Sequence, residues 1–231
     1  NPDVIVSARL NRGRLSLGID LSGHSLHMRG YRTDKGVAPL KENLAAALLM
    51  RAGWPEIASA GGDFVDPMCG SGTLVIEAAM MALDMAPGRK QERFGFEKWP
   101  GHQPELWLSL SQEAERRAHE GKQGRIPKLA GFDQDSRVIA TAWKNIQRAG
   151  LESIVHVEAR AVDALSLEGD WSGKGLVLTN PPYGERLSER RELGALYQAL
   201  GDAVKRAVPG WRLGVFTGAP EFGKSIGLRS Y

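Results

Sequence analysis

The spacing of apolar residues along the chain predicts where strands and helices lie. Between residues 4 and 28 apolar and polar residues alternate on either side of the turn sequence Asn11-Arg12-Gly13, which predicts a β-hairpin. Further along, apolar residues recur every three or four positions in some stretches and form short continuous runs in others. The first pattern predicts helices at 41–51, 73–83, 136–149 and 192–208, and the second predicts strands at 64–66, 129–132, 154–157, 176–178 and 213–216.

From residue 64 onward the predicted strands alternate with the predicted helices. Such alternation is typical of an α/β fold in which a parallel sheet is covered by helices on both faces. The stretch 86–128 interrupts the alternation. It is rich in aromatic and basic residues and contains an amphipathic helix around 105–120, so we interpret it as an insertion. Ligands of such sheets bind at the carboxyl ends of the strands, and a functional site is expected at that edge.

Composition narrows the class of protein. With 231 residues, of which 42% are hydrophobic and 25% charged, the chain has room for one substantial core and a small appendage. A net charge of +3 permits a nucleic-acid partner without requiring one. The single cysteine, Cys69, excludes an internal disulfide, and no apolar run is long enough for a membrane span, so we expect a cytoplasmic protein without membrane association. Because the sequence starts at Asn1 rather than Met, we also expect further domains of a longer parent chain.

A glycine-rich turn, Asp66-Pro67-Met68-Cys69-Gly70-Ser71-Gly72-Thr73, separates a predicted strand from a predicted helix. The N–H groups of such a turn and the positive end of the helix favour a carboxylate or a phosphate. Val75 stands where a dinucleotide fingerprint has its third glycine, and no Gly-Lys-Ser/Thr ending is present. Asp66 would repel a pyrophosphate but would suit an ammonium group, so a zwitterionic head such as that of methionine is favoured. A turn selected only for tight packing is the alternative.

Two more aspartates follow predicted strands. Asp133 can accept hydrogen bonds from both hydroxyls of a ribose, as an acidic residue about 20 positions beyond the glycine turn does in dinucleotide folds. Its separation from Asp66 is 67 residues, and removing the 43 residues of the insertion leaves 24. Asp135 is interpreted as the N-cap of the following helix. Asp163 stands where an adenine amino group would lie, although a solvated loop aspartate fits its position nearly as well.

A third motif, Asn180-Pro181-Pro182-Tyr183-Gly184, follows the predicted strand 176–178. The two prolines stiffen the backbone and remove N–H donors, which leaves a rigid set of hydrogen-bond acceptors. The Asn180 side-chain oxygen and the Pro181 carbonyl could hold the two N–H groups of a base amine and aim its lone pair at a sulfonium methyl. Tyr183 could stack on an extruded base, so the predicted catalytic residues are Asn180, Pro181, Pro182 and Tyr183. The motifs together predict S-adenosylmethionine as the cofactor and no metal ion, with a plain two-proline turn as the alternative.

These motifs resemble those of the THUMP-containing N2-guanine RNA methyltransferases, within the wider group of amino-methyltransferases that carry an Asn/Asp-Pro-Pro-Tyr motif. Residues 21–32 look like the last strand of the THUMP module and its exit, and residues 38–45 look like the helix that precedes the catalytic domain. The insertion at 86–128 is similar to that of the subgroup that modifies guanine in 23S ribosomal RNA. The similarity extends over nearly the whole chain.

The resemblance implies a Rossmann-like class I methyltransferase domain at 33–231, truncated at its C-terminus and preceded by a THUMP remnant at 1–32. It implies methyl transfer from S-adenosylmethionine to the exocyclic N2 of a guanine in 23S ribosomal RNA. The place of Cys69 in the turn points the thiol at the cofactor rather than at a base. The expected cofactor-binding residues are Ala38, Leu40, Asp66, Pro67, Met68, Cys69, Gly70, Gly72, Thr73, Asp133, Gln134, Asp163, Ala164 and Asn180.

The insertion combines positive charge with aromatic surface, which predicts contact with RNA phosphates and bases. The expected RNA-binding residues are Arg89, Lys90 and Arg93, beside Phe94, Phe96 and Trp99. A solvated flap that covers the core with its aromatic residues fits equally well. Two other functions stay open: an N6-adenine DNA methyltransferase, which shares the tetrapeptide, and a non-catalytic RNA-binding module. A DNA enzyme usually needs a target-recognition region, which no long segment after Gly184 supplies, and the intact motifs argue against the second alternative.

Overall fold

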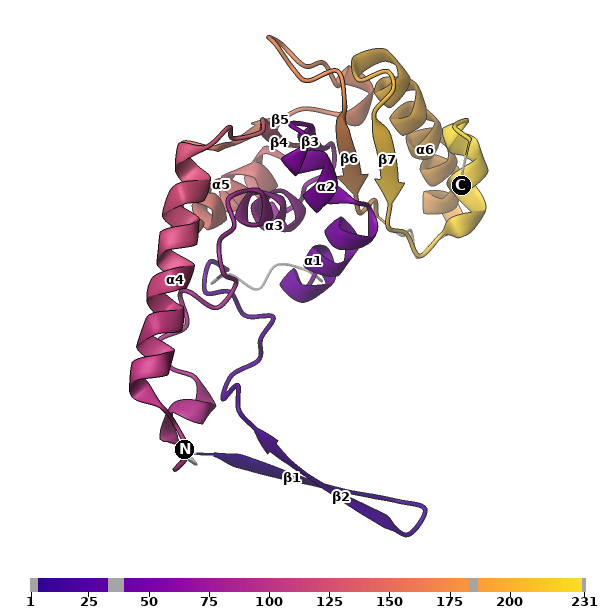
Figure 1. Ribbon diagram of the computed structural model, residues 1–231. Helices are drawn as coiled ribbons and strands as arrows, with labels where there is room; N and C mark the ends of the chain where they lie inside the picture. The colour runs from indigo at the N-terminus through magenta and orange to yellow at the C-terminus, as the bar shows by residue number, and fades with distance from the viewer. Residues whose placement is uncertain (1–3, 33–39, 183–186, 230–231) are drawn as a thin grey trace.

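A five-stranded parallel sheet forms the centre of the computed structural model, which describes residues 4–32, 40–182 and 187–229, with the backbone alone for 187–191 (Figure 1). The strand order is β5-β4-β3-β6-β7. The strands are β3 (Asp63–Asp66), β4 (Leu129–Asp133), β5 (Val155–Ala159), β6 (Gly175–Thr179) and β7 (Arg212–Val215). The sheet confirms the predicted α/β fold, and each strand overlaps its predicted position.

Helices cover the sheet on both faces because successive strand residues point to opposite sides. The main helices are α1 (Glu42–Arg51), α3 (Thr73–Ala82), α5 (Ser136–Ala149) and α6 (Leu187–Ala207). In β3, Phe64 packs in a core with residues of α1, α3 and α5, whereas Val65 packs in a second core with residues of α6. Both side chains are fully buried. The sheet therefore separates two apolar cores, as the predicted double covering requires.

The α-helix α2 (Trp54–Ser59) was not predicted from the sequence. It has six residues, too few to show a helical spacing of apolar positions. The Trp54 ring is fully buried, lies edge-on to Phe64 at a centroid distance of 5.2 Å, and donates a hydrogen bond from its indole nitrogen to the Ala78 carbonyl (2.9 Å). Tertiary packing of one tryptophan thus fixes this element.

The stretch 86–128 lies beside the sheet. It contains the short helix η1 (Gly95–Lys98) and the long helix α4 (Pro104–Gln123), which extends along one side of the molecule (Figure 1). The rings of Phe94, Phe96 and Trp107 contact one another with centroids 4.9 to 5.4 Å apart. These aromatic residues form a small core within the insertion, which supports the flap interpretation of Phe94 and Phe96. Of the described helices, α4 and α6 included, none is long and apolar enough to cross a membrane.

The N-terminal segment forms the predicted hairpin from β1 (Ile5–Asn11) and β2 (Arg14–Asp20). Arg12 and Gly13 between the strands have φ of 49° and 74°, the positive values that a two-residue hairpin turn requires. Residues directly opposed across the strands share a face. One face is wholly apolar and exposed, and its opposed pairs are Val6 with Ile19, Ala8 with Leu17 and Leu10 with Leu15.

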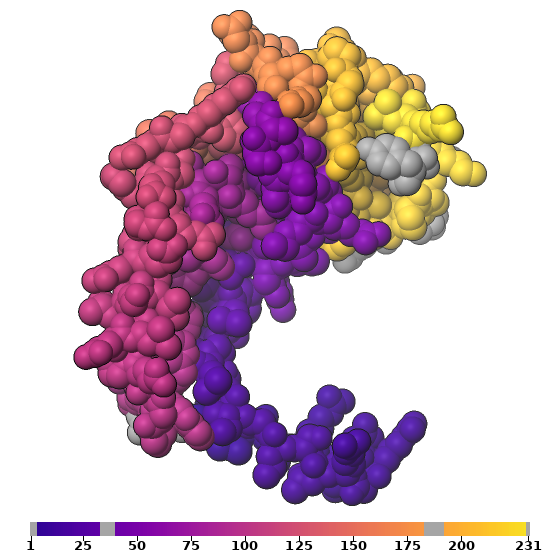
Figure 2. All heavy atoms as spheres, viewed as in Figure 1, coloured from indigo at the N-terminus to yellow at the C-terminus, as the bar shows by residue number. Residues whose placement is uncertain are grey.

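The base of the hairpin is fastened to the insertion. The backbone N–H groups of Gly95 and Phe96 donate to the carbonyls of Ser22 (3.2 Å) and Leu21 (2.9 Å). Gly23 has a φ of 76°, and a Cβ there would lie 2.8 Å from the Gly95 nitrogen, so the two segments meet backbone to backbone. The carboxyl ends of β6 and β7 point toward the side on which the hairpin lies, and a hollow separates the hairpin from the core (Figures 1 and 2).

Replacing Leu17 with Lys tests what the apolar hairpin face does in this chain. Because that face does not pack on the sheet, we expect Tm to stay within about 2 °C of the parent value, while self-association in analytical ultracentrifugation decreases. Ser16→Lys, on the polar face, is the control and should change neither quantity. A fall in Tm of more than about 5 °C for the Leu17 variant alone would place the face within the core.

Candidate functional site

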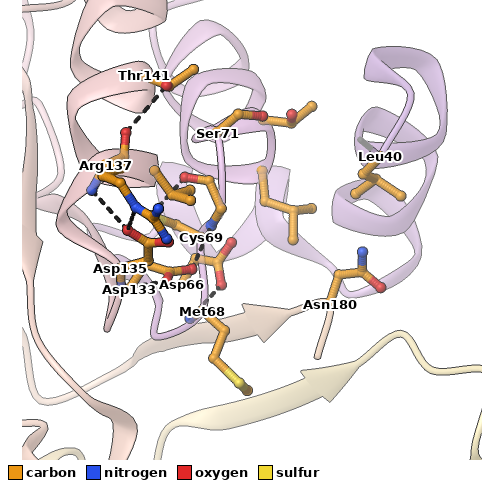
Figure 3. A pocket seen from close by; sticks show the side chains of 14 residues that line it. Leu40, Asp66, Met68, Cys69, Ser71, Asp133, Asp135, Arg137, Thr141 and Asn180 are labelled. Carbon is orange, nitrogen blue, oxygen red and sulfur yellow. Dashed lines mark hydrogen bonds and ion pairs between the residues drawn. The ribbon is translucent and has the colours of Figure 1, made fainter. Parts of the chain in front are cut away.

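A cavity of about 590 Å³ opens at the carboxyl ends of β3, β4 and β6 (Figure 3). Its volume lies within the range of sites for small molecules and cofactors. The lining residues are Leu40, Asp66, Met68, Cys69, Gly70, Ser71, Thr73, Leu74, Asp133, Asp135, Arg137, Val138, Thr141 and Asn180. Figure 3 shows the three aspartates, Cys69 and Arg137 gathered together, with Leu40 and Asn180 standing apart from them. Carboxylates thus concentrate in one part of the cavity and an amide lies in another.

The loop that joins β3 to α3 lies against β4. The Cys69 N–H donates to the Phe132 carbonyl (2.8 Å). Gly70 and Gly72 have φ of 54° and 84°, a left-handed conformation that favours glycine. A Cβ at Gly131 would lie 2.9 Å from the Cβ of Cys69, so the strand needs a glycine where the loop crosses it. These contacts fix the loop in one position at the cavity.

Helix α5 supports the same loop. Asn145 is fully buried, and its side-chain amide donates to the Ser71 carbonyl (3.0 Å). The Asn145 amide gives the Ser71 carbonyl a hydrogen-bond donor. Without that donor, the carbonyl would carry the cost of its desolvation. Asn145 therefore joins α5, the helix that follows β4, to the glycine-rich loop.

Asp66 ends β3 and is 1% exposed. Its carboxylate accepts a hydrogen bond from the Met68 N–H (3.1 Å). Burial raises the pKa of Asp66 to about 7, and the negative charge of Asp133 acts in the same direction. A cation placed beside it would favour the ionised form, so this position suits an ammonium group.

Asp133 ends β4 and has two roles. One carboxylate oxygen accepts a hydrogen bond from the Gly70 N–H (3.1 Å), and the other accepts from the Asp135 N–H (3.0 Å). Each carboxylate oxygen keeps further acceptor capacity, so the group can also accept hydrogen bonds from a ligand in the cavity. Asp135 is the N-cap of α5, as predicted, and accepts from the Arg137 N–H (2.9 Å).

Cys69 is 6% exposed. Burial raises the pKa of its thiol well above the ordinary value, and the negative charges of Asp66 and Asp133 add to the effect. The thiol is therefore neutral at physiological pH. A neutral, buried thiol is a poor nucleophile, which supports the interpretation of Cys69 as part of the loop.

The third motif begins directly after β6. Asn180 lines the cavity, Pro181 is buried and Pro182 is exposed. Tyr183 lies outside the described residues, and so does Ala38, which was expected to bind the cofactor. The described part of the motif is thus at the same edge of the sheet as Asp66 and Asp133.

The cavity differs from the predicted set of cofactor-binding residues. Five of that set do not line it: Pro67, Gly72, Gln134, Asp163 and Ala164. Asp163 is exposed in the short helix η2 (Val162–Ala164), and its backbone carbonyl accepts a hydrogen bond from Arg206 (2.6 Å). Six lining residues were not predicted as cofactor contacts: Ser71, Leu74, Asp135, Arg137, Val138 and Thr141. The last four of these residues lie at the start of α5. The place of this helix directly after the strand-end residue Asp133 is the signal that would have indicated them.

The predicted RNA-binding residues differ in their surroundings. The Arg89 guanidinium donates two hydrogen bonds to Glu115 of α4 (2.9 and 3.2 Å). Burial lowers the pKa of Lys90, and the positive charge of Arg89 acts in the same direction. Arg93 is exposed, and the nearby Trp99 is 41% exposed. Arg89 and Lys90 are exposed as well, so the three basic residues and the Trp99 ring all offer accessible surface.

Comparisons with known proteins match the whole chain. The family described as "RMKL-like, methyltransferase domain" matches residues 29–231. Ribosomal RNA large subunit methyltransferase K/L of Marinobacter nauticus is 81% identical over all 231 residues, and the protein of that name from Pseudomonas aeruginosa is 51% identical over the same length. The chain spans about a third (32%) of the length of each of these relatives.

Solved structures show the same fold. A protein from Listeria monocytogenes, named as a predicted N6-adenine-specific DNA methylase, is 35% identical with a TM-score of 0.83. SMU.472, solved in complex with SAH, is 34% identical with a TM-score of 0.83. Each alignment covers 97% of this chain and 56% of the other. TrmN from Thermus thermophilus, 20% identical with a TM-score of 0.59, shares the fold.

Replacing Asn145 with Leu tests the support of the loop by α5. The Ser71 carbonyl would lose its donor, so we expect a loss of about 1 to 3 kcal/mol in the free energy of unfolding and faster amide exchange in the loop 67–72. Lys144→Leu, an exposed neighbour on the same helix, is the control. Equal stability and equal exchange in both variants would contradict the assigned role of Asn145.

Proposed function

The chain belongs to the RMKL-like methyltransferase domain family, and from this premise we propose that it transfers a methyl group from S-adenosylmethionine to the exocyclic N2 of a guanine in 23S ribosomal RNA. The observation that supports the proposal most is the cavity, which combines Asp66 and Asp133 at two strand ends with Asn180 at a third. Carboxylates suited to an ammonium group and to ribose hydroxyls thus face the same space as an amide suited to a base amine.

The cavity fits the cofactor in charge as well as in volume. Asp66 is placed to meet the ammonium group of the methionine moiety, and Asp133 to accept the ribose hydroxyls. The start of α3, where Thr73 is the first residue and no side chain caps the helix, offers N–H groups for the carboxylate. Leu40 adds apolar surface. SMU.472, with 34% identity, was solved with SAH, which supports the same ligand class here.

S-adenosylmethionine supplies an electrophilic methyl group, so the protein has to orient the base nitrogen that receives it. We propose that the Asn180 side-chain oxygen and the Pro181 carbonyl accept the two N–H groups of the base amine. Such acceptors favour a nitrogen lone pair that points out of the ring plane. Positioning of this kind needs no strong base, and Asn180 acts on the reacting atoms directly. Tyr183 and the stacking role assigned to it remain part of the proposal.

The choice of ribosomal RNA over DNA rests on the curated relatives. Two proteins named as ribosomal RNA large subunit methyltransferases match every residue of this chain, at 81% and 51% identity. The Listeria monocytogenes protein carries the name of a DNA methylase at the lower identity of 35%. N6-adenine methylation of DNA therefore stays the second candidate. A ribosomal RNA substrate also favours a cytoplasmic location.

We further propose that different parts of the chain belong to different domains. Residues 1–32 would be the remnant of a THUMP module, and residues 33–231 the methyltransferase domain. RNA contacts on the insertion would depend more on Lys90 and Arg93, which are both exposed, than on Arg89, which is already paired with Glu115. The 32% coverage of the relatives leaves room for further domains in the parent protein.

Replacing Asn180 with Ala should separate binding from chemistry. We expect the dissociation constant for S-adenosylmethionine to change by less than about threefold and single-turnover methylation of ribosomal RNA to slow by about 10² or more, because a positioned polar group is lost in the transition state. Asn180→Asp, which keeps an acceptor oxygen, is the conservative comparison. Parent-level rates in a folded Asn180→Ala protein would exclude the catalytic role.

The raised pKa of Asp66 predicts a pH dependence of cofactor binding. Below about pH 7 the carboxyl group is protonated and cannot pair with an ammonium group, whereas above it the ionised form is ready. The dissociation constant for S-adenosylhomocysteine should therefore rise about tenfold between pH 8 and pH 6. Isothermal titration at both values measures it, with Asp66→Asn as the control that should lose the dependence. Equal affinity at pH 6 and pH 8 in the parent chain would contradict the assignment.

A further inference from the structure

Arg32 contacts two residues of the cavity from outside it. Its Nη2 donates to the Leu40 carbonyl (3.0 Å) and to the Thr73 hydroxyl. Leu40 and Thr73 both line the cavity. We propose that Arg32 is a positioning residue for the amino-acid end of the cofactor, an inference that rests on the proposed function.

The two edges of the Arg32 guanidinium face different partners. Its side chain is 12% exposed, and its Nε lies 3.7 Å from the carboxylate of Glu42, whose side chain is 5% exposed. The acidic partner therefore stands on the Nε side, and the Nη2 edge faces Thr73 and Leu40. The positive edge of the guanidinium is directed at the wall of the cavity.

The Arg32 guanidinium faces the N-terminus of α3, because Thr73 begins that helix. Gly72, before Thr73, provides no side-chain cap. The free N–H groups and the dipole at this helix start favour an anion, and Arg32 adds a formal positive charge beside them. The carboxylate of a methionine moiety is the anion that the proposed ligand would bring. Asp66 attracts the ammonium group, so the two charges of the zwitterion would meet opposite partners.

A second ion pair holds the segment that carries Arg32. Tyr31 is 1% exposed and donates to Glu77 of α3 (3.1 Å), and the Arg29 Nε lies 3.5 Å from the same carboxylate. Neither Arg29 nor Glu77 lines the cavity. Arg29 thus holds this segment against α3 through a partner that does not line the cavity, which makes it a matched control for Arg32.

The experiment compares two ligands. S-adenosylhomocysteine carries the amino-acid group, and 5′-methylthioadenosine shares its adenosine and sulfur but lacks that group. For Arg32→Met we expect the dissociation constant of S-adenosylhomocysteine to rise about tenfold, while that of 5′-methylthioadenosine stays within about twofold. Arg29→Met should lower Tm comparably and leave the ratio of the two constants unchanged. Isothermal titration and thermal unfolding measure both.

The possible results separate the two proposals. Equal weakening of both ligands by Arg32→Met would overturn the positioning role and leave a general structural brace. If Arg32→Met does not fold, Arg32→Lys replaces it: lysine keeps the positive charge on a shorter side chain that lacks the guanidinium fork, so a smaller but still selective loss of S-adenosylhomocysteine binding is expected, and an unselective loss would overturn the inference. Failure of the parent chain to bind either ligand would instead contradict the proposed function.

Discussion

The contact of the glycine-rich loop with β4 determines where the acidic part of the site and the start of α3 lie. The Cys69 N–H bonds to a strand carbonyl, the Gly70 N–H bonds to the carboxylate of Asp133, and Gly131 leaves room for the loop to cross. One strand-end carboxylate therefore braces the loop and lines the cavity at the same time. Because the loop leads directly into α3, the start of that helix is fixed too, and with it the contact between Thr73 and Arg32. If the loop moved relative to β4, the carboxylates that line the cavity and the N-terminus of α3 would move together.

Those features that depend on local sequence could be predicted. Short continuous apolar runs predicted the five strands, and helical spacings of apolar residues predicted the main helices, because a parallel sheet buried on both faces imposes a strong pattern. The carboxyl ends of such strands share one edge, which brought Asp66, Asp133 and Asn180 together in the prediction and in the structure. Asp133 became recognisable once the insertion was subtracted, because α4 and its neighbours are added beside the sheet without disturbing the order of β3 and β4.

Features that depend on distant partners could not be predicted. Nothing in the sequence joins Arg32 to Glu42 and Thr73, and a buried glutamate on a helix has the same local pattern as an exposed one. Asn145 supports a loop 74 residues earlier in the chain, through a hydrogen bond that no spacing rule describes. Asp163 lies exposed in η2 and does not line the cavity, so its expected place near the adenine stays a prediction. Long-range hydrogen bonds and buried ion pairs thus account for most of what the pattern missed.

The attachment of the hairpin to the insertion has a consequence for the order in which the protein assembles. A two-stranded hairpin with one apolar face is at best marginally stable alone. Its base is closed by hydrogen bonds from Gly95 and Phe96 to Ser22 and Leu21, partners about 74 residues apart. At a synthesis rate of about 5 to 20 residues per second, the hairpin leaves the ribosome roughly 4 to 15 s before those partners exist. During that interval its six apolar side chains have no fixed base, so the hairpin is secured only after a segment about 74 residues later in the chain has been made.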